Sequence, residues 1–592
     1  MALKGLFATK SLEQLHAEMH DDNRLRRVLG PIGLTSLGIG AIIGAGIFVL
    51  TGEIAATGAG PSILVSFVIT FVCCALAALC YAEFASMVPV AGSAYTYAYA
   101  TLGELLAWII GWDLILEYAM SAATVASSWS KYFNHFTEVL FNWRMPDYLS
   151  NDPFAAENAG IMNLPAVLIL LACTVVLVIG IRESATSNTA LVLLKMGVVV
   201  FVIVAGIRYF HKENWTEIPV WQRVHPEEHV FADKTNEWVR DHEKLKGESA
   251  TARAEQLLRE VRASHKIETA EKFGTPEQIQ KVAERYQKNL PPPADQSAVA
   301  AILAEARKEA PAKAAEKWGV LGLFGISDAL ARVDDSWRST FFPYGLSGVM
   351  FGAAMLFFVY LGFDAVSTHA EEAVNPQRDV PIGILGSLVV CTLLYMGVAT
   401  VLIGMVPYPD IDKDTAVSSA FEENRFAQIL IAAGALAGMT SVLLITFLSQ
   451  ARIFLAMARD GLLPHNVFGV VHPRFRTPHR STIVTGLLMA AVAAFTPINA
   501  LEEMVNIGTY FAFIIVCAAV MLMRVKKPDA PRPFRCPLIY VVAPLGIIIN
   551  LAMMLFLAPV TWARLGVWLA IGLALYFTYG SRFSTLRNNL AT

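Results

Sequence analysis

An apolar stretch near the N-terminus reads GIGAIIGAGIF from Gly38 to Phe48 and carries four glycines. Small residues at such spacing allow neighbouring membrane helices to pack closely, which is one interpretation. The other is that the helix unwinds. Backbone groups freed by unwinding are tolerated inside a membrane only where they line a cavity or meet a ligand. We predict unwinding near residues 42–46, where the N-terminus of a half-helix would offer donors to an anion such as a carboxylate.

A second apolar stretch reads FFVYLGFDA from Phe357 to Ala365. Asp364 lies well inside it, and an ionisable residue within an apolar run indicates a functional site. The alternative is that Asp364 caps the second half of a broken helix, which also requires a break. Interrupted helices at matching positions in two halves of a chain are typical of a transporter binding site.

The composition indicates a protein that lipid solvates. Of its 592 residues, 55% are hydrophobic and 16% are charged, whereas a soluble domain carries about 25% charged residues. The net charge of −3 argues against a nucleic-acid binder, which would be basic. Twelve apolar runs are candidates for membrane helices. They cover residues 31–50, 62–88, 105–132, 164–181, 188–209, 346–369, 382–406, 427–457, 481–496, 504–523, 537–557 and 563–579.

The distribution of lysine and arginine predicts the orientation. With the N-terminus in the cytoplasm, most basic residues of the short loops lie on the cytoplasmic side, as does the C-terminus, which is the arrangement expected in the cytoplasmic (inner) membrane. The chain then divides into five parts. They are a cytoplasmic segment (1–30), five spans (31–210), an extracytoplasmic insertion (211–342), five further spans (343–525), and two last spans with a cytoplasmic end (526–592).

The insertion is charged and interrupts the apolar pattern. Residues 275–278 read TPEQ, which is typical of a helix start, and three prolines at 291–293 end that helix. A second helix is expected over 297–310. We interpret the insertion as a solvated helical segment without chemistry of its own, since charged amphipathic stretches are usually exposed. The alternatives are a docking site for a small membrane or extracytoplasmic partner, and a lid over the outer vestibule.

Several runs of sequence resemble one family of membrane transporters. They are GAIIGAGIF at 40–48, YAEFA at 81–85, VPVAGSAYTY at 88–97, GWDLILEY at 111–118, GFDAV at 362–366 and ARDGL at 458–462. The chain resembles the amino acid–polyamine–organocation superfamily and, within it, the cationic amino acid transporter family with its bacterial proton-coupled members. The resemblance implies an all-α polytopic membrane protein with the leucine-transporter fold, which has two inverted five-helix repeats plus two extra helices. It also implies import of amino acids.

The resemblance places an L-amino acid between the two quoted stretches. Its carboxylate would meet first-span backbone donors at Ile42, Ile43, Gly44, Ala45 and Gly46. Its amino group would meet sixth-span carbonyls at Phe358, Val359, Leu361 and Gly362. The electrostatics agree, because a zwitterion needs opposite partial charges at its two ends and broken helices supply them. Many relatives carry a hydroxyl residue where Ala45 stands, so this chain leaves carboxylate contacts to the backbone.

Lys195 lies inside the fifth predicted span, where a lysine is costly unless it is paired, hydrated or neutral. Extension of its side chain to the membrane surface is the alternative. In similar proton-coupled transporters the matching lysine occupies the place of a sodium ion. The resemblance therefore implies a proton-coupling role, with contacts to the first span near Gly40 and to the eighth span near Thr440 or Ser441.

Glu117 is another carboxylate within a predicted span, the third. It could line the side-chain pocket and favour cationic substrates, or it could form a structural hydrogen bond to a neighbouring helix. For Glu83 and Asp113 we expect structural or gating roles.

The sequence carries no motif of an enzyme or an ATP-driven pump. A phosphate-binding Gly-Lys-Ser/Thr loop, a His-Glu-x-x-His zinc motif and a Gly-x-Ser-x-Gly nucleophile motif are all missing. We expect no enzyme activity, no metal, and no cofactor other than a coupling proton. The leading hypothesis is a secondary active transporter that imports L-amino acids with protons by alternating access. An exchanger without net proton coupling and a non-transporting sensor are the alternatives, and the substrate side chain is left open.

Overall fold

A computed structural model describes residues 7–10, 29–88, 92–154, 159–179, 185–216, 226–243, 248–273, 296–475 and 477–591, together with positions 276, 279, 280, 282 and 284. Within these ranges the chain is built from helices, and one isolated bridge between Leu29 and Ala373 is its sole strand-like pairing.

Among the described residues, eight helical segments are long and apolar enough to cross a membrane. They are Gly46–Met87, Glu104–Phe141, Val192–Tyr209, Gly345–Thr368, Pro376–Met405, Arg425–Arg459, Ile498–Lys526 and Pro559–Phe583. Four shorter apolar helices accompany them: Pro31–Ile42, Leu164–Ile179, His479–Phe495 and Ile539–Leu555. Each apolar run identified in the sequence overlaps one of these segments. The prediction of an all-α polytopic membrane protein is therefore confirmed, while the count of twelve crossings stays a prediction.

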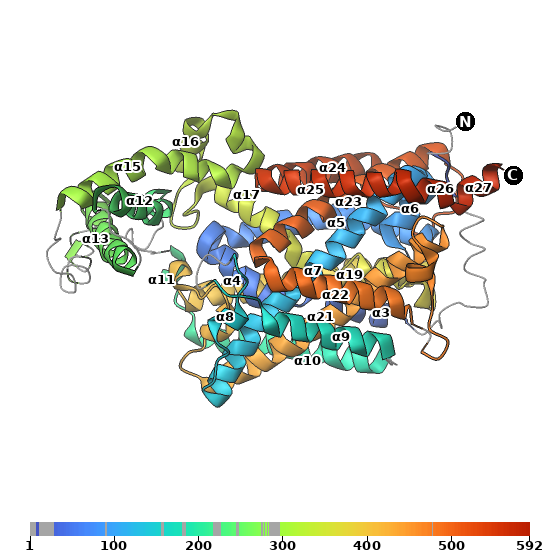
Figure 1. Ribbon diagram of the computed structural model, residues 1–592, viewed down its shortest axis with the longest axis horizontal. Coiled ribbons are helices and arrows are strands. Elements are labelled where there is room, and N and C mark those ends of the chain that lie inside the picture. The colour runs from blue at the N-terminus through green and yellow to red at the C-terminus, as the bar shows by residue number, and fades with distance from the viewer. Residues whose placement is uncertain are drawn as a thin grey trace.

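The apolar helices lie side by side in one bundle (Figure 1). The first half contains α3 (Pro31–Ile42), η1 (Gly46–Leu50), α4 (Thr51–Ile54), α5 (Ile63–Met87), α7 (Glu104–Phe141), α9 (Leu164–Ile179) and α10 (Ala185–Gly206), with the short α6 (Ser93–Thr101) before α7. The second half contains α17 (Gly345–Leu356), η9 (Phe357–Tyr360), α18 (Ala365–Thr368), α19 (Pro376–Met405), α21 (Arg425–Arg459), α22 (His479–Phe495) and α23 (Ile498–Lys526). Then come α24 (Ile539–Leu555), α25 (Pro559–Leu575) and α27 (Thr585–Ala591).

Between α10 and α17 the chain forms a separate helical cluster. It contains α12 (Phe231–Trp238), α13 (Glu248–Phe273) and α15 (Gln296–Ala315), and η8 (Glu316–Phe324) and α16 (Ser327–Trp337) lead back to α17. The cluster lies at one end of the bundle, which we call the insertion end, and α6 and α27 lie at the other end, the terminal end (Figure 1). The cluster has a buried apolar core of its own, formed by Val230, Phe231, Val239, Ala254, Leu257, Val261, Ala298, Val299, Ile302, Leu303 and Ala306.

The helices of the insertion differ from those expected. The helix expected to start at 275 falls mostly outside the described residues. The one expected over 297–310 is part of the longer α15, which continues past Pro311 because alanines on both sides favour the helix. The sequence analysis did not predict α13, although its buried Ala254, Leu257 and Val261 recur at helical spacing among many charged residues.

Ion pairs connect the helices at the terminal end. The carboxylate of Glu83, buried on α5, accepts from the guanidinium of Arg524 on α23 at 2.7 Å and from the backbone N–H of Cys536 at 2.8 Å. Lys10 pairs with Asp460 at 2.8 Å. A buried carboxylate is stable only when it is paired and hydrogen-bonded, so these groups hold α5 against α23 and the N-terminal segment against the end of α21.

Candidate functional site

The first apolar span is broken in its middle. The helix α3 ends at Ile42, Ile43 has an extended backbone (φ −74°, ψ 102°), and helical geometry resumes at Ala45. The glycines explain why the break packs closely against another segment, since a Cβ on Gly46 would lie 2.9 Å from the Cα of Val359. The predicted unwinding near residues 42–46 is therefore confirmed, and the N-terminus of the second half-helix faces the sixth span.

The sixth span is broken as well. The helix α17 passes into η9, Leu361 is extended (ψ 139°), and α18 starts at Ala365. Gly362 has φ +114°, a region that favours glycine, and a Cβ there would lie 2.8 Å from the carbonyl carbon of Ala41. The backbone of Gly362 thus lies directly against the end of α3, and both breaks meet at one place in the bundle.

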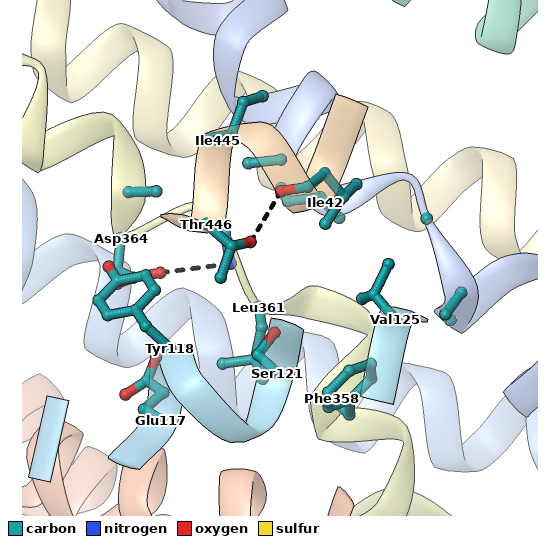
Figure 2. Close-up of a pocket in the computed structure, with 17 residues that line it drawn as sticks. Ile42, Glu117, Tyr118, Ser121, Val125, Phe358, Leu361, Asp364, Ile445 and Thr446 are labelled. Atoms are coloured by element: carbon teal, nitrogen blue, oxygen red, sulfur yellow. Dashed lines mark hydrogen bonds between the residues drawn. The ribbon is translucent and has the colours of Figure 1, made fainter. Parts of the chain in front are cut away.

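A small cavity of about 30 Å³ lies where the two breaks meet (Figure 2). It brings together most of the residues predicted to bind substrate, namely Ile42, Gly44, Ala45, Gly46, Glu117, Phe358, Leu361 and Gly362. Two predicted residues do not line it. Ile43 turns its carbonyl toward Lys195, and Val359 packs on Gly46. The extended backbone of Ile43 explains its orientation, because successive residues of an extended segment point to opposite sides, whereas Val359 lies within η9.

The cavity also contains residues that the sequence reading missed. They are Ala41, Tyr118, Ser121, Val125, Ala365, Val442, Ile445 and Thr446; Asp364, which the sequence indicated as a functional-site candidate, lines the cavity with them. Ser121 and Val125 follow Glu117 at spacings of four on α7, so they share its helix face. That spacing is the signal by which they could have been found. The lining residues Val442, Ile445 and Thr446 of α21 carried no such signal, because their approach depends on long-range packing.

The cavity is closed in this conformation. A volume of about 30 Å³ holds roughly two water molecules, which is less than an amino acid needs. A ligand of that size enters only if the helices around the cavity move apart. Gly44 lies directly on Val442 and Gly46 on Val359, so these contacts close the cavity on two sides.

Asp364 joins the sixth span to the third at the cavity. Its carboxylate accepts from the hydroxyl of Tyr118 at 2.7 Å and from the backbone N–H of Gly362 at 3.2 Å. Figure 2 shows Tyr118 beside Asp364, with Glu117 next to it on the same helix. The bond to Gly362 holds the loop of the break. Asp364 thus positions the broken segment, as a helix cap would, and also lines the cavity.

Glu117 and Asp113 are two buried carboxyl groups one turn apart on α7. The Oε2 atom of Glu117 and both carboxyl oxygens of Asp113 have no hydrogen-bond partner among the described residues. A buried carboxyl group without a partner is costly. Of the two, Glu117 lines the cavity, so a cation or proton entering there would relieve that cost.

Lys195 connects α10 to the broken first span. Its side chain is buried, and its amino nitrogen donates to the carbonyl oxygens of Gly40 at 2.5 Å and Ile43 at 3.3 Å. Its methylene chain lies against Gly438 of α21, where an added Cβ would be 3.7 Å from Cδ of Lys195. The side chain therefore does not extend to the membrane surface, and it touches the fifth, first and eighth spans.

Lys195 meets the eighth span at Gly438, one turn from Ser441, and the predicted contact with Thr440 or Ser441 stays a prediction. Thr440 accepts from the indole N–H of Trp129 at 3.2 Å and donates to the carbonyl of Leu436 at 2.8 Å. Ser441 is buried, and both described hydrogen bonds of Lys195 go to the first span.

The end of α3 offers carbonyl oxygens to side chains rather than to its own helix. Gly40 and Ile43 accept from Lys195, and Ile42 accepts from the hydroxyl of Tyr395 at 2.8 Å. Carbonyls at a helix C-terminus carry partial negative charge, so a protonated amine is stabilised there.

Among the described residues, no group of three or more His, Cys, Asp or Glu residues is arranged to hold a metal ion.

Comparison with known proteins identifies relatives over nearly the whole chain. A family model described as "Amino acid permease" matches residues 29–243 and 318–575. It leaves out residues 244–317, which belong to the helical insertion.

Three relatives illustrate the range of named substrates. The methylthioribose transporter of Bacillus subtilis (strain 168) is 35% identical over 587 residues, covering 99% of this chain and 100% of that protein. The branched-chain amino acid permease of the same organism is 35% identical over 589 residues, with the same coverage. The vacuolar cationic amino acid transporter 4 of Arabidopsis thaliana is 31% identical over 531 residues, covering 89% of this chain and 68% of that protein.

Proposed function

Because this chain belongs to the amino acid permease family, we propose that it is a secondary active transporter that imports L-amino acids across the cytoplasmic membrane with protons. The observation that carries the proposal is the cavity between the two broken spans. Both chain ends would lie in the cytoplasm and the insertion outside, consistent with the placement of α6 and α27 at the bundle end opposite α12, α13 and α15.

The two breaks supply complementary partial charges for a zwitterion. The second half of the first span begins at Ala45, and the first backbone N–H groups of a helix lack partners within it, so the substrate carboxylate binds there beside Gly46. Carbonyl groups near Phe358 and Leu361, where η9 ends, receive the ammonium group. Binding both ends of the zwitterion draws the two halves together, which is the movement that alternating access needs.

Lys195 would couple this movement to protons. When protonated, it binds the carbonyls of Gly40 and Ile43 and holds the inner half of the first span against α10. When neutral, it attracts those carbonyls less strongly, so the half-helix is released. The bonds to the break itself support this role, because the titrating group then acts on the segment that binds substrate.

The relatives do not agree on the substrate, since their names give a thiosugar, branched-chain amino acids and cationic amino acids. Glu117 in the cavity is the observation that favours cationic side chains, because its Oε2 lacks a partner among the described groups. Ser121, Val125 and Phe358 line the cavity too, so an aliphatic side chain would also find apolar contacts. We therefore propose broad amino acid transport with a preference that Glu117 sets.

Uptake into proteoliposomes tests the proposal. The purified protein is reconstituted and offered labelled lysine, leucine, alanine and methylthioribose, each with and without an inward proton gradient. Accumulation of an amino acid that the gradient drives is the expected result. Exchange of internal for external substrate without a response to the gradient would make the protein an exchanger, and binding without flux would make it a sensor. Uptake of methylthioribose alone would contradict amino acid transport.

A further inference from the structure

The elements η8 and α16 lead the chain from the insertion back to the bundle. One side of this segment packs against the apolar helices. The indole N–H of Trp318 in η8 donates to Asp334 of α16 at 3.0 Å, and Asp334 accepts from the backbone N–H of Ser347 at 2.7 Å. The ring of Trp318 lies 5.7 Å from that of Phe556, and Gly319 packs against the backbone of the turn that joins α24 to α25. This segment is therefore held at the height where those two apolar helices end.

The other side of the same segment exposes large apolar side chains. Leu323 and Phe324 are 67% and 69% exposed, and Trp337 is 50% exposed. Ile326 and Val333 are exposed as well. On a helix, residues 326, 333 and 337 share one face. Charged Asp328, Arg332 and Asp335 are distributed over the opposite side. An exposed apolar face of this kind, continuous with two neighbouring side chains, marks a contact surface.

The neighbouring surface is the one that faces lipid. Helix α24 contacts η8 and exposes Ile548 and Leu551, and α25 exposes Val560 close to the same turn. Figure 1 shows α16 next to the ends of α24 and α25 at the insertion end. The apolar side of η8 and α16 thus continues the lipid-facing surface of the bundle at its boundary, where tryptophan is favoured.

We propose that residues 323–337 form an interfacial contact in which the apolar side of η8 and α16 inserts into the lipid leaflet at the insertion end. An amphipathic helix binds the headgroup boundary through its apolar face, and basic residues strengthen binding to anionic lipid. Here Arg338 pairs with Asp335 at 2.8 Å, and Arg332 lies among acidic residues. The contact is therefore apolar in origin and independent of lipid charge.

The consequence is that contact with the bilayer holds the base of the insertion beside the first span. Lys317, which directly precedes Trp318, donates to the carbonyl oxygen of Thr57 at 3.0 Å, and Thr57 belongs to the outer continuation of the broken span. The family model omits residues 244–317, so the lipid contact fixes this cluster at the point where it joins the part of the chain that the family model matches.

Site-directed fluorescence in lipid bilayers tests the contact. The full-length protein with Phe324→Cys is labelled with an environment-sensitive dye and reconstituted in nanodiscs. The seven native cysteines are all buried, so labelling is directed to the new thiol. We expect several-fold stronger quenching by lipids that carry a nitroxide near the headgroup than by aqueous iodide. The matched control, Asp328→Cys on the opposite face of α16, should show the reverse.

Three outcomes would overturn the proposal. The first is equal access of iodide to dyes at positions 324 and 328. The second is protection of position 324 in anionic but not in zwitterionic lipid, which would make the contact electrostatic. The third is protection that appears only when a nanodisc holds two copies or an added membrane protein, which would assign the face to a protein partner. If a labelled variant does not fold, the double variant Phe324→Ser with Trp337→Ser provides a second test. In that variant, iodide should quench a dye at position 326 more strongly than it does when Phe324 and Trp337 are present.

Discussion

The amino nitrogen of Lys195 lies 2.5 Å from the carbonyl oxygen of Gly40, at the point where the first span loses its helical hydrogen bonds. A second hydrogen bond, to the carbonyl oxygen of Ile43, joins the same amine to the residue that follows α3. One titratable group therefore contacts both the last turn of a half-helix and the unwound segment beyond it. Its charge acts directly on the backbone that binds substrate in the proposed mechanism.

Removing the amine should uncouple transport from protons. Hydrogen bonds to charged groups contribute about 1.5–3 kcal/mol, so we expect Lys195→Ala and the better space-filling Lys195→Met to lower gradient-driven uptake by about tenfold or more. The measurement is initial uptake in proteoliposomes with and without an imposed pH gradient. The control is Gly197→Ala on the same helix, where an added Cβ meets no atom within 4 Å. A full response to the gradient in both Lys195 variants would refute the assignment.

Neutralising Glu117 should change substrate preference rather than abolish transport. Its carboxylate lines the cavity, and Oε2 lacks a partner among the described groups. We expect Glu117→Gln to lower the lysine-to-leucine ratio of kcat/KM by about tenfold, which corresponds to about 1.4 kcal/mol. Glu138→Gln, an exposed glutamate on the same helix, should keep the wild-type ratio. If Glu117→Gln shows the same lysine-to-leucine ratio of kcat/KM as Glu138→Gln, Glu117 has a structural role.

The close approach of the two broken spans should not tolerate a methyl group. Gly362 has φ +114°, and an added Cβ would lie 2.8 Å from the backbone of Ala41. A left-handed backbone costs a non-glycine residue about 1–2 kcal/mol, and the clash adds to that. We expect Gly362→Ala to lower the thermal unfolding temperature in detergent and to abolish uptake. Gly197→Ala should do neither, and wild-type stability in Gly362→Ala would show that the contact is loose.

Local signals in the sequence were enough to predict both breaks. Glycines at 38–46 and the Gly362–Asp364 pair marked the segments, since glycine and a buried carboxylate are both unfavourable in a continuous apolar helix. The approach of Lys195 to Gly40 also agrees with the expectation. Pairings that depend on how distant helices rotate were not predicted, such as that of Tyr118 with Asp364 and the packing of Lys195 directly on Gly438.

The insertion was less predictable from its sequence than the bundle. The apolar side chains of α13 are few, and its buried Ala254, Leu257 and Val261 contribute to a core completed by α12 and α15. Such a core depends on contacts between helices distant in sequence, which a periodicity within one helix does not report. The exposed side of α16 is more regular, and residues 326, 333 and 337 show helical spacing in the sequence itself.

Lys317, at the base of the insertion, should make stability depend on pH. Its amino nitrogen donates to the carbonyl of Thr57 and lies 3.6 Å from the centre of the Tyr344 ring. Loss of hydration, followed by repulsion from Arg338, lowers its pKa from 10.5 to about 7, and Asp334 opposes the shift. The folded protein therefore binds this proton less readily than the unfolded chain does. Its unfolding free energy should rise as the pH increases from about 7 toward 10.5.

Thermal unfolding between pH 7 and pH 9.5 checks this expectation. We expect the unfolding temperature of the wild type to rise with pH relative to that of Lys317→Met, which carries no titrating group at this position. Below pH 7 both unfolded and folded states bind the proton, so the difference between the two proteins should become constant there. Lys308→Met, a change at an exposed lysine of α15, should follow the wild-type curve. Parallel curves for the wild type and Lys317→Met above pH 7 would show that Lys317 keeps its ordinary charge in the folded protein.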